Sequence, residues 1–233
     1  MGEITRTREP NSMLRFLRDL LIIVLAALLV SFLVKTFLIR SFWIPSGSMK
    51  DTLQIDDHVI VNERATIHRG DVVVFSDPGG WLDAAGSTEG RSVQPRSLMS
   101  DVLSLVGLGS DGGNHLVKRV IGLPGDHVQC CNALGQMEVN GVPLSEPYVR
   151  KQPGEAASGT PFDVTVPAGK LWVMGDNRYE SADSRAHQSL PTKGFVPEQD
   201  VVGRAVAISW PVQRWAGVSD YPSVFAGTDP DQH

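Results

Sequence analysis

A long apolar run close to the N-terminus limits what this chain can fold into more than any other feature. Residues 20–39 are apolar apart from one serine, one lysine and one threonine. A helix of ~20 residues extends for ~30 Å, which matches the hydrocarbon core of a bilayer. Lys35 lies near the end of the run, where its aliphatic stem can reach the interface. The run therefore predicts a single transmembrane helix over residues 20–39, preceded by a tail (residues 1–19) and followed by a separate domain (residues 40–233).

Basic residues around the run predict its orientation. Arg6, Arg8, Arg15 and Arg18 precede it, and Lys35 and Arg40 lie at its other end. Because short segments rich in basic residues stay on the cytoplasmic side, we expect a cytoplasmic N-terminus, with residues 40–233 on the outer face of the plasma membrane. A cleavable signal peptide would instead have an apolar region of about 7 to 15 residues that ends at a small-x-small site. This run is longer and no good site precedes Trp43, so we expect a retained, single-pass anchor.

After the run the pattern changes to short β-branched segments bounded by turn residues, which is typical of strands. These segments cover residues 57–62, 70–75, 115–123, 126–131, 136–140, 162–166, 170–174 and 201–210. Asn140-Gly141, between Val139 and Val142, predicts a hairpin turn of the primed type. Helical periodicity is almost absent, so we predict an all-β domain of packed antiparallel sheets.

Residues 77–114 interrupt the strand pattern with Gly, Ser and Asp. A connection this long inside a compact domain is usually a functional or a disordered loop. Within it, residues 97–106 carry apolar side chains on one arc and polar side chains on the opposite side, which predicts a short amphipathic helix. So short a helix needs a surface to lie on. It either packs on the chain's own β-domain or dips into the bilayer interface, and both alternatives stay open.

Composition and spacing exclude several classes of function. The net charge of -5 offers no basic surface for a nucleic acid. The 6 histidines form no cluster with metal-ligand spacing, so we expect no metal site. Gly107, Gly109 and Gly112 match a dinucleotide fingerprint by letter but precede a strand instead of following one, so we interpret them as loop glycines and expect no cofactor.

The 2 cysteines, Cys130 and Cys131, are adjacent. At this spacing a mutual bridge does not reach normal disulfide geometry. They cannot connect distant parts of the chain, and the sequence leaves their redox state open.

The segment directly after the apolar run contains a candidate nucleophile. Residues 44–53 read IPSGSMKDTL. On its own such a segment is usually a turn at the membrane exit. If Ser48 is a nucleophile, the rest of the chain must supply a base and an oxyanion-stabilising donor.

Two later segments could supply these groups. Lys118 lies in the largely apolar segment HLVKRVIGLPGD, residues 115–126, where strand alternation can point it inward. Burial would lower the pKa of this lysine and make its neutral amine a general base, whereas the alternative is a surface lysine beside Arg119. Residues 175–185, GDNRYESADSR, carry more polar groups than a turn needs and form either a network around a site or a solvated loop.

Taken together, the chain resembles the bacterial type I signal peptidases, membrane-bound Ser/Lys endopeptidases that remove signal peptides from exported proteins. The matching blocks are Ser46-Gly47-Ser48-Met49 with Thr52-Leu53, GDVVVF at 70–75, KRVIGLPGD at 118–126, GDNRYESADSR at 175–185 and GFVPEQDVVGRAV at 194–206. One position departs from the family pattern, because Asp51 stands where the family commonly has proline.

The resemblance implies a role for each matching residue. Ser48 would be the nucleophile and Lys118 the base, with the Ser46 hydroxyl and the Ser48 backbone N–H as oxyanion donors. Ser181 would orient the lysine, and Asp183 and Arg185 would support the site. Ile44, Pro45, Leu53 and Val117 would wall small pockets that accept alanine or similar residues at P1 and P3. The partners implied are exported preproteins with signal peptides and the lipid bilayer, and no metal or organic cofactor is required.

Two alternatives compete with this interpretation. A self-cleaving repressor of the SOS type also uses a Ser/Lys pair on a β-domain, but the predicted anchor and the acidic charge argue against it. A membrane-anchored β-domain that binds a partner without catalysis is the alternative from another class, and in it Ser48 and Lys118 would be incidental.

Overall fold

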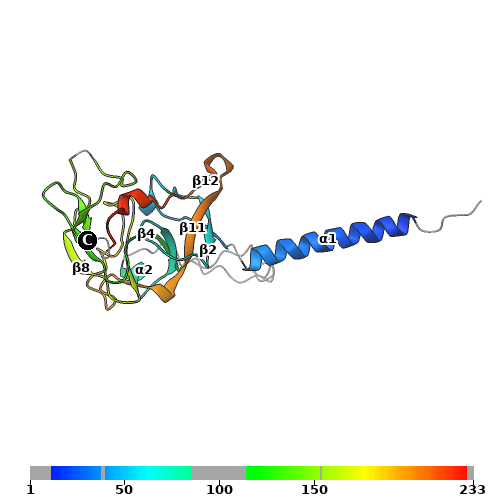
Figure 1. Cartoon of the computed structure of the whole chain (residues 1–233), viewed down its shortest axis with the longest axis horizontal. Helices are drawn as coiled ribbons and strands as arrows, with labels where there is room; N and C mark the ends of the chain where they lie inside the picture. Colours follow the sequence, from blue (N-terminus) through cyan, green and yellow to red (C-terminus); the bar gives the residue numbers. More distant parts are fainter. Residues whose placement is uncertain (1–11, 38–39, 85–113, 153, 230–233) are drawn as a thin grey trace, which may run out of the picture. The chain divides into compact units, whose positions relative to one another are not determined.

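The computed structural model describes residues 12–37, 40–84, 114–152 and 154–229 (Figure 1). The chain divides into two compact units, Met1–Leu38 and Ile39–His233. The predicted amphipathic helix over residues 97–106 lies outside the described residues.

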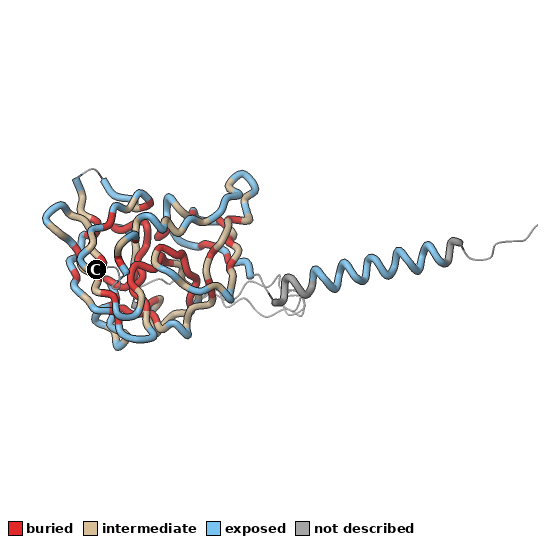
Figure 2. The backbone as a smooth tube through the Cα atoms, in the orientation of Figure 1, coloured by how far each residue is buried: buried red, intermediate tan, exposed pale blue. Residues whose placement is uncertain are grey.

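The first unit contains one helix, α1 (Ser12–Phe37). Leucine is the most frequent residue in its sequence and is a good helix former. Its described side chains, from Arg15 to Ser31, are all exposed (Figure 2). Within the described part of the chain, no helix is both long and apolar enough to cross a membrane. The predicted transmembrane helix over residues 20–39 is therefore not confirmed by the structure.

The second unit is built on an 8-stranded sheet. Its strands are β1 (Arg40–Trp43), β2 (His58–Asn62), β3 (Val72–Ser76), β4 (His115–Gly122), β9 (Lys170–Met174), β10 (Val196–Pro197), β11 (Val201–Trp210) and β12 (Ala216–Gly217). They follow the order β1-β2-β11-β3-β4-β9-β10, with β12 paired to β11. All of these pairs are antiparallel.

A second, 4-stranded antiparallel sheet follows the order β7-β6-β5-β8. Its strands are β5 (His127–Cys130), β6 (Met137–Val139), β7 (Val142–Pro143) and β8 (Phe162–Thr165). Val139 pairs with Val142 across the Asn140-Gly141 turn, and both turn residues have positive φ, 52° and 80°. These angles are those of a type I′ turn, so the predicted primed hairpin is confirmed.

The predicted fold class, an all-β domain of antiparallel sheets, is confirmed. Strands β1, β7, β10 and β12 were not predicted, because each has only 2 to 4 residues and shows no alternation of its own. The remaining described elements are short: α2 (Trp81–Ala84) and the 3-10 turns η1 (Gly47–Met49), η2 (Glu198–Asp200), η3 (Val212–Arg214) and η4 (Pro222–Phe225).

Apolar side chains pack on both faces of the large sheet, and Figure 2 colours many of its residues as buried. Val72 and Val74 of β3 join one cluster, which includes residues of β1 and β2. Val73 and Phe75 join a second cluster with residues of β4 and β9. Side chains alternate along a strand, so a strand with both faces covered reads as a continuous apolar run, as β3 does.

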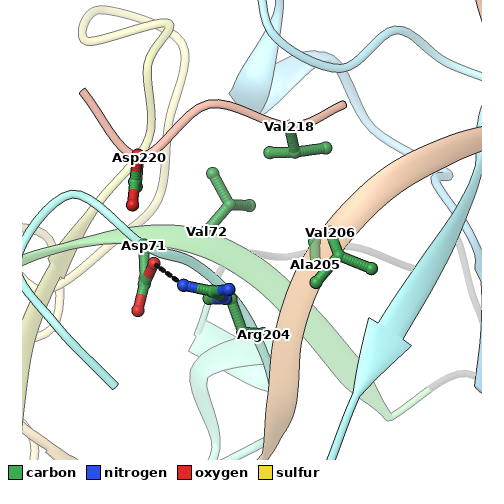
Figure 3. Close-up of a pocket in the computed structure, with 7 residues that line it drawn as sticks. All are labelled: Asp71, Val72, Arg204, Ala205, Val206, Val218 and Asp220. Atoms are coloured by element: carbon green, nitrogen blue, oxygen red, sulfur yellow. Dashed lines mark hydrogen bonds and ion pairs between the residues drawn. The ribbon is translucent and has the colours of Figure 1, made fainter. Parts of the chain in front are cut away.

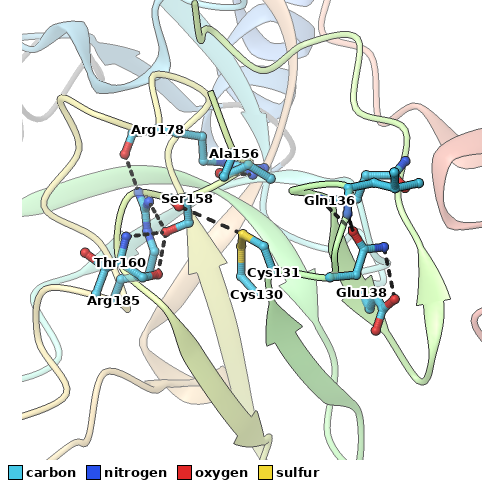
Figure 4. The surroundings of a disulfide bond; sticks show 12 residues. Cys130, Cys131, Gln136, Glu138, Ala156, Ser158, Thr160, Arg178 and Arg185 are labelled. Carbon is cyan, nitrogen blue, oxygen red and sulfur yellow. Dashed lines mark hydrogen bonds between the residues drawn. A yellow bond between two sulfur atoms is a disulfide. The ribbon is translucent and has the colours of Figure 1, made fainter. Parts of the chain in front are cut away.

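Cys130 and Cys131 form a disulfide at the end of β5 (Figure 4). Their Cα atoms are 2.9 Å apart, the spacing across the cis peptide bond that joins them, which is less than in most disulfides. The bond joins neighbours and therefore connects no distant parts of the chain. Cys131 Sγ contacts the carbonyl oxygen of Ser158 at 3.9 Å.

Candidate active site

Ser48 lies in the connection between β1 and β2, residues 44–57, which we call the Ser48 loop. Two backbone hydrogen bonds close its base, from Ile44 N to Asp57 O at 2.9 Å and from Asp56 N to Ile44 O at 3.0 Å. The turn η1 carries Ser48 at its centre, where the residue is only 8% exposed. The loop thus holds a serine with restricted contact to water.

Strand β4 brings Lys118 to this serine. The lysine is 3% exposed, and its Nζ donates hydrogen bonds to Ser48 Oγ at 2.7 Å and to the carbonyl oxygen of Val117 at 3.1 Å. Lys118 is therefore a buried residue and not a surface lysine. The two side chains, 70 residues apart in sequence, make direct contact.

Burial lowers the pKa of Lys118 from 10.5 to about 8. The carboxylates of Asp183 and Asp176 act in the opposite direction, and the charge of Arg185 adds to the lowering. Burial has the largest effect because it penalises the ammonium form. A neutral amine in hydrogen-bonding contact with a serine hydroxyl can take its proton.

The Ser46 hydroxyl lies beside the same serine. Ser46 Oγ is 3.3 Å from Ser48 Oγ, and Ser46 is exposed. A hydroxyl in this position can donate to an oxyanion formed when Ser48 attacks a carbonyl group. The structure therefore brings three of the predicted residues together: Ser46, Ser48 and Lys118.

The segment after β9 holds the backbone of the Ser48 loop. Asn177 N donates to Ser48 O at 3.0 Å, and Asn177 Nδ2 donates to Gly47 O at 3.2 Å. Gly175 packs so closely that a Cβ atom there would lie 2.6 Å from Ser48 O and 2.2 Å from Ser181 Oγ. Only glycine fits this contact.

The Oγ atom of Ser181 is buried near Gly175, but it makes no hydrogen bond to Lys118 in this structure. Within the described part of the chain its Oγ has no hydrogen-bond partner. The hydrogen bonds of Lys118 go to Ser48 and Val117 instead. The predicted contact between Ser181 and Lys118 is thus not made.

Asp183 and Arg185 form a fully enclosed ion pair. Asp183 accepts from Arg185 Nε at 2.8 Å and Nη2 at 2.7 Å, and from Gly175 N at 2.9 Å. Burial by itself would raise the pKa of Asp183, but the hydrogen bonds and the charge of Arg185 outweigh it, so the pKa is lowered. Arg185 also donates to Ser158 Oγ at 3.0 Å (Figure 4). The pair thus fixes a negative charge near Lys118.

A second buried ion pair supports the site, and no role for it was predicted. Arg119 donates hydrogen bonds to both carboxylate oxygens of Asp176, from Nε at 2.9 Å and from Nη2 at 2.8 Å. Thr52 of the Ser48 loop donates to the same carboxylate. Arg119 follows Lys118 in the largely apolar strand β4, a signal that could have indicated its burial, whereas Asp176 lies two residues after the end of β9 in a polar segment.

The four residues predicted to wall the substrate pockets differ in how far they are buried. Ile44 and Leu53, 2% and 0% exposed, belong to an apolar cluster with Met49, and Val117 packs against it. Pro45 is exposed. None of these four lines the pocket drawn in Figure 3. Among the residues that the structure describes, no group of three or more His, Cys, Asp or Glu could hold a metal ion.

Comparisons with known proteins match the sequence of this chain to one family. The model of the family described as "Signal peptidase, peptidase S26" matches residues 17–210. Signal peptidase I of Mycobacterium tuberculosis (strain H37Rv) is 37% identical over 239 residues, covering 93% of this chain and 81% of that protein. Signal peptidase I U of Bacillus subtilis (strain 168) is 28% identical over 221 residues, covering 91% and 96%.

One solved structure is also similar in sequence. It is the crystal structure of a signal peptidase I from Enterococcus faecalis V583, which is 26% identical to this chain. The alignment covers 60% of this chain and 97% of that chain, with a TM-score of 0.39.

Proposed function

This chain belongs to the signal peptidase family, peptidase S26, and we propose that it is a membrane-bound serine endopeptidase that removes signal peptides from exported preproteins. The observation that carries the proposal is the buried 2.7 Å contact between Lys118 Nζ and Ser48 Oγ. A lysine whose pKa lies at about 8 is partly neutral near neutral pH. It can therefore act as the base that activates the serine.

The reaction starts when Ser48 Oγ attacks the carbonyl carbon of the scissile peptide bond. The hydroxyl proton moves to the neutral Nζ of Lys118, which becomes an ammonium group. The negative charge on the carbonyl oxygen is stabilised by the Ser46 hydroxyl and the Ser48 backbone N–H. When the carbon–nitrogen bond breaks, Lys118 returns its proton to the leaving amine, and Ser48 is left as an acyl ester.

A water molecule completes the cycle. Neutral Lys118 takes a proton from the water, whose oxygen attacks the ester carbonyl. Lys118 then protonates Ser48 Oγ as the ester bond breaks. This step releases the cleaved signal peptide and restores the serine. No metal or organic cofactor has a part in these steps.

Ser181 has an orienting role in this scheme. After it takes a proton, Lys118 has three N–H donors, and the Ser48 oxygen and the Val117 carbonyl occupy two of them. The Ser181 hydroxyl is buried and makes no other described hydrogen bond, so it can accept the third. Asp183, held by Arg185, favours this ammonium form electrostatically.

We propose that the enzyme cuts after small residues, in Ala-x-Ala sequences. Ile44, Leu53 and Val117 lie in or against one apolar cluster that also includes Met49, the residue next to Ser48. With Pro45, these side chains would wall pockets for P1 and P3. Well-packed apolar walls penalise side chains larger than the space available, which is why the pockets would admit only small residues.

A membrane location follows from the anchor that the sequence predicts over residues 20–39, with residues 1–19 in the cytoplasm and residues 40–233 on the outer face. Three exposed tryptophans support it: Trp43, Trp210 and Trp215 are 54%, 57% and 72% exposed. Trp43 and Trp210 both pair with His58, so they lie at neighbouring strand ends beside the Ser48 loop. Tryptophan is enriched at membrane interfaces because its ring is apolar and its N–H is polar.

Incubation of the detergent-solubilised chain with a radiolabelled preprotein tests the proposal. We expect a single cut after the Ala-x-Ala sequence, mapped by N-terminal sequencing of the product. A serine-reactive lactam should block the cut by labelling Ser48. Specific binding of the preprotein without any cut would instead favour a non-catalytic binding domain, and cleavage of the chain itself alone would favour an autoprotease.

A further inference from the structure

Three buried aspartates in the β-domain share one local arrangement. Asp57, Asp71 and Asp126 directly precede β2, β3 and β5. Each accepts a hydrogen bond from the backbone N–H three residues earlier, and each pairs with an arginine. The arrangement caps a turn at the point where a strand begins. The turn of Asp57 differs from the other two, because it lies at the end of the Ser48 loop.

Asp57 holds the base of this loop through both its backbone and its side chain. Its carbonyl oxygen accepts from Ile44 N, and its carboxylate accepts from Gln54 N at 2.8 Å. Arg214 donates two hydrogen bonds to the same carboxylate, from Nε at 2.8 Å and from Nη2 at 2.9 Å. A bidentate pair of hydrogen bonds of this kind fixes both the distance and the angle between the guanidinium and the carboxylate.

Arg214 reaches the loop from a distant part of the chain. It ends η3, 157 residues after Asp57, and lies outside every block that matches the family pattern. Only 29% of its side chain is exposed, although its neighbour Trp215 is 72% exposed. The guanidinium group therefore connects the segment after β11 with the base of the Ser48 loop.

We infer that Arg214 is a positioning residue for the proposed reaction. Its bidentate bond to Asp57 holds the Ser48 loop in the position in which Ser48 Oγ contacts Lys118 Nζ. This inference rests on the proposed role of Ser48 as the nucleophile. Arg214 contacts no reacting atom and acts through Asp57. A small displacement of a reacting group costs rate even when substrate binding is unchanged, so the expected effect is on kcat and not on KM.

Arg204 and Asp71 offer a matched control in the same molecule. Arg204 Nη1 donates to Asp71 Oδ1 at 3.2 Å, and 33% of its side chain is exposed, close to the value for Arg214. In Figure 3 its guanidinium points at Asp71 beside a pocket. The pocket is lined by Asp71, Val72, Arg204, Ala205, Val206, Val218 and Asp220. None of these residues belongs to the Ser48 loop.

The test compares Arg214→Gln, Arg204→Gln and Ser48→Ala in the detergent-solubilised full chain, with a model preprotein that carries Ala at P1 and P3. We expect Arg214→Gln to lower kcat by roughly 10- to 100-fold, with KM changed by less than about twofold. Arg204→Gln should keep the wild-type kcat. Both arginine variants should lower Tm, by about 5 °C, because each removes the arginine that pairs with a buried carboxylate.

A double variant separates positioning from stability. Asp57→Asn with Arg214→Gln leaves no buried charge unpaired, so its Tm should recover relative to Arg214→Gln while its kcat stays low. If Arg214→Gln alone does not fold, kcat is measured in the double variant instead. The inference is overturned if the double variant regains the wild-type kcat, or if Arg214→Gln loses no more activity than Arg204→Gln. Turnover by Ser48→Ala would instead refute the proposed function itself, whereas an inactive Ser48→Ala beside a fully active Arg214→Gln refutes only the role of Arg214.

Discussion

The backbone N–H of Asn177 donates a hydrogen bond to the carbonyl oxygen of Ser48 at 3.0 Å. The bond joins the segment after β9 to the turn that carries the serine. The Asn177 side chain adds a second bond, to the carbonyl oxygen of Gly47. Because the two segments are far apart in sequence, the position of Ser48 depends on a tertiary contact and not on its own turn alone.

We predict that Gly175→Ala disrupts this contact. The added methyl group would lie 2.6 Å from Ser48 O and 2.2 Å from Ser181 Oγ, so the loop must move away. Overpacking of this kind costs ~1–3 kcal/mol, and we expect a fall in both Tm and kcat. Gly217→Ala is the control, because the nearest atom to a Cβ there is 3.9 Å away. Equal activity of the two variants would show that the contact does not position Ser48.

Ser48→Ala and Lys118→Ala should each abolish cleavage of a preprotein, because the nucleophile and its base act as one unit. For the same reason the double variant should be no slower than either single variant. Single-turnover assays with a radiolabelled preprotein measure the residual rates. Additive losses in the double variant would mean that the two residues act independently.

The rate should rise with pH, because only the neutral amine of Lys118 can accept the serine proton. We expect kcat/KM to increase towards a plateau, with its midpoint at the lowered pKa of about 8. Asp183→Asn removes a carboxylate that raises the pKa of Lys118, so the midpoint should move to lower pH. A peptide substrate without ionisable groups gives the profile. A midpoint that moves to higher pH in Asp183→Asn would contradict this electrostatic account.

Lys118→Met should yield an inactive but more stable protein. Lowering the lysine pKa from 10.5 to about 8 corresponds to a cost of about 3 kcal/mol. Below pH 8 the lysine is charged in both the folded and the unfolded chain, so this full cost applies and methionine removes it. Between pH 8 and 10.5 the unfolded chain binds more protons, so wild-type stability rises with pH and the advantage of methionine fades. Thermal unfolding at pH 7 and pH 10 measures the difference, and a variant less stable than wild type at pH 7 would contradict the prediction.

The exposed tryptophans beside the Ser48 loop should matter only for substrates in a bilayer. We expect Trp210→Ser with Trp215→Ser to slow the cleavage of a preprotein embedded in vesicles, while a soluble peptide is cut at the wild-type rate. Leu134→Ser is the control, because Leu134 is 82% exposed but follows β5, in the small sheet. The full chain, reconstituted in the same vesicles, is used throughout. Equal slowing of both substrates would place the tryptophans in the site instead of at the membrane.

Local sequence patterns were enough to predict the β-architecture, the turn at Asn140-Gly141 and the candidate pair Ser48 and Lys118. Alternation, turn residues and short motifs are local patterns, so they can be read without knowledge of tertiary contacts. The tertiary structure decided how these parts meet. It paired Arg119 with Asp176 and left Ser181 without its predicted contact to Lys118. It also brought Arg214 to Asp57 across 157 residues. Such contacts depend on which strands become neighbours in the sheet, and on side chains buried between them, which no local pattern records.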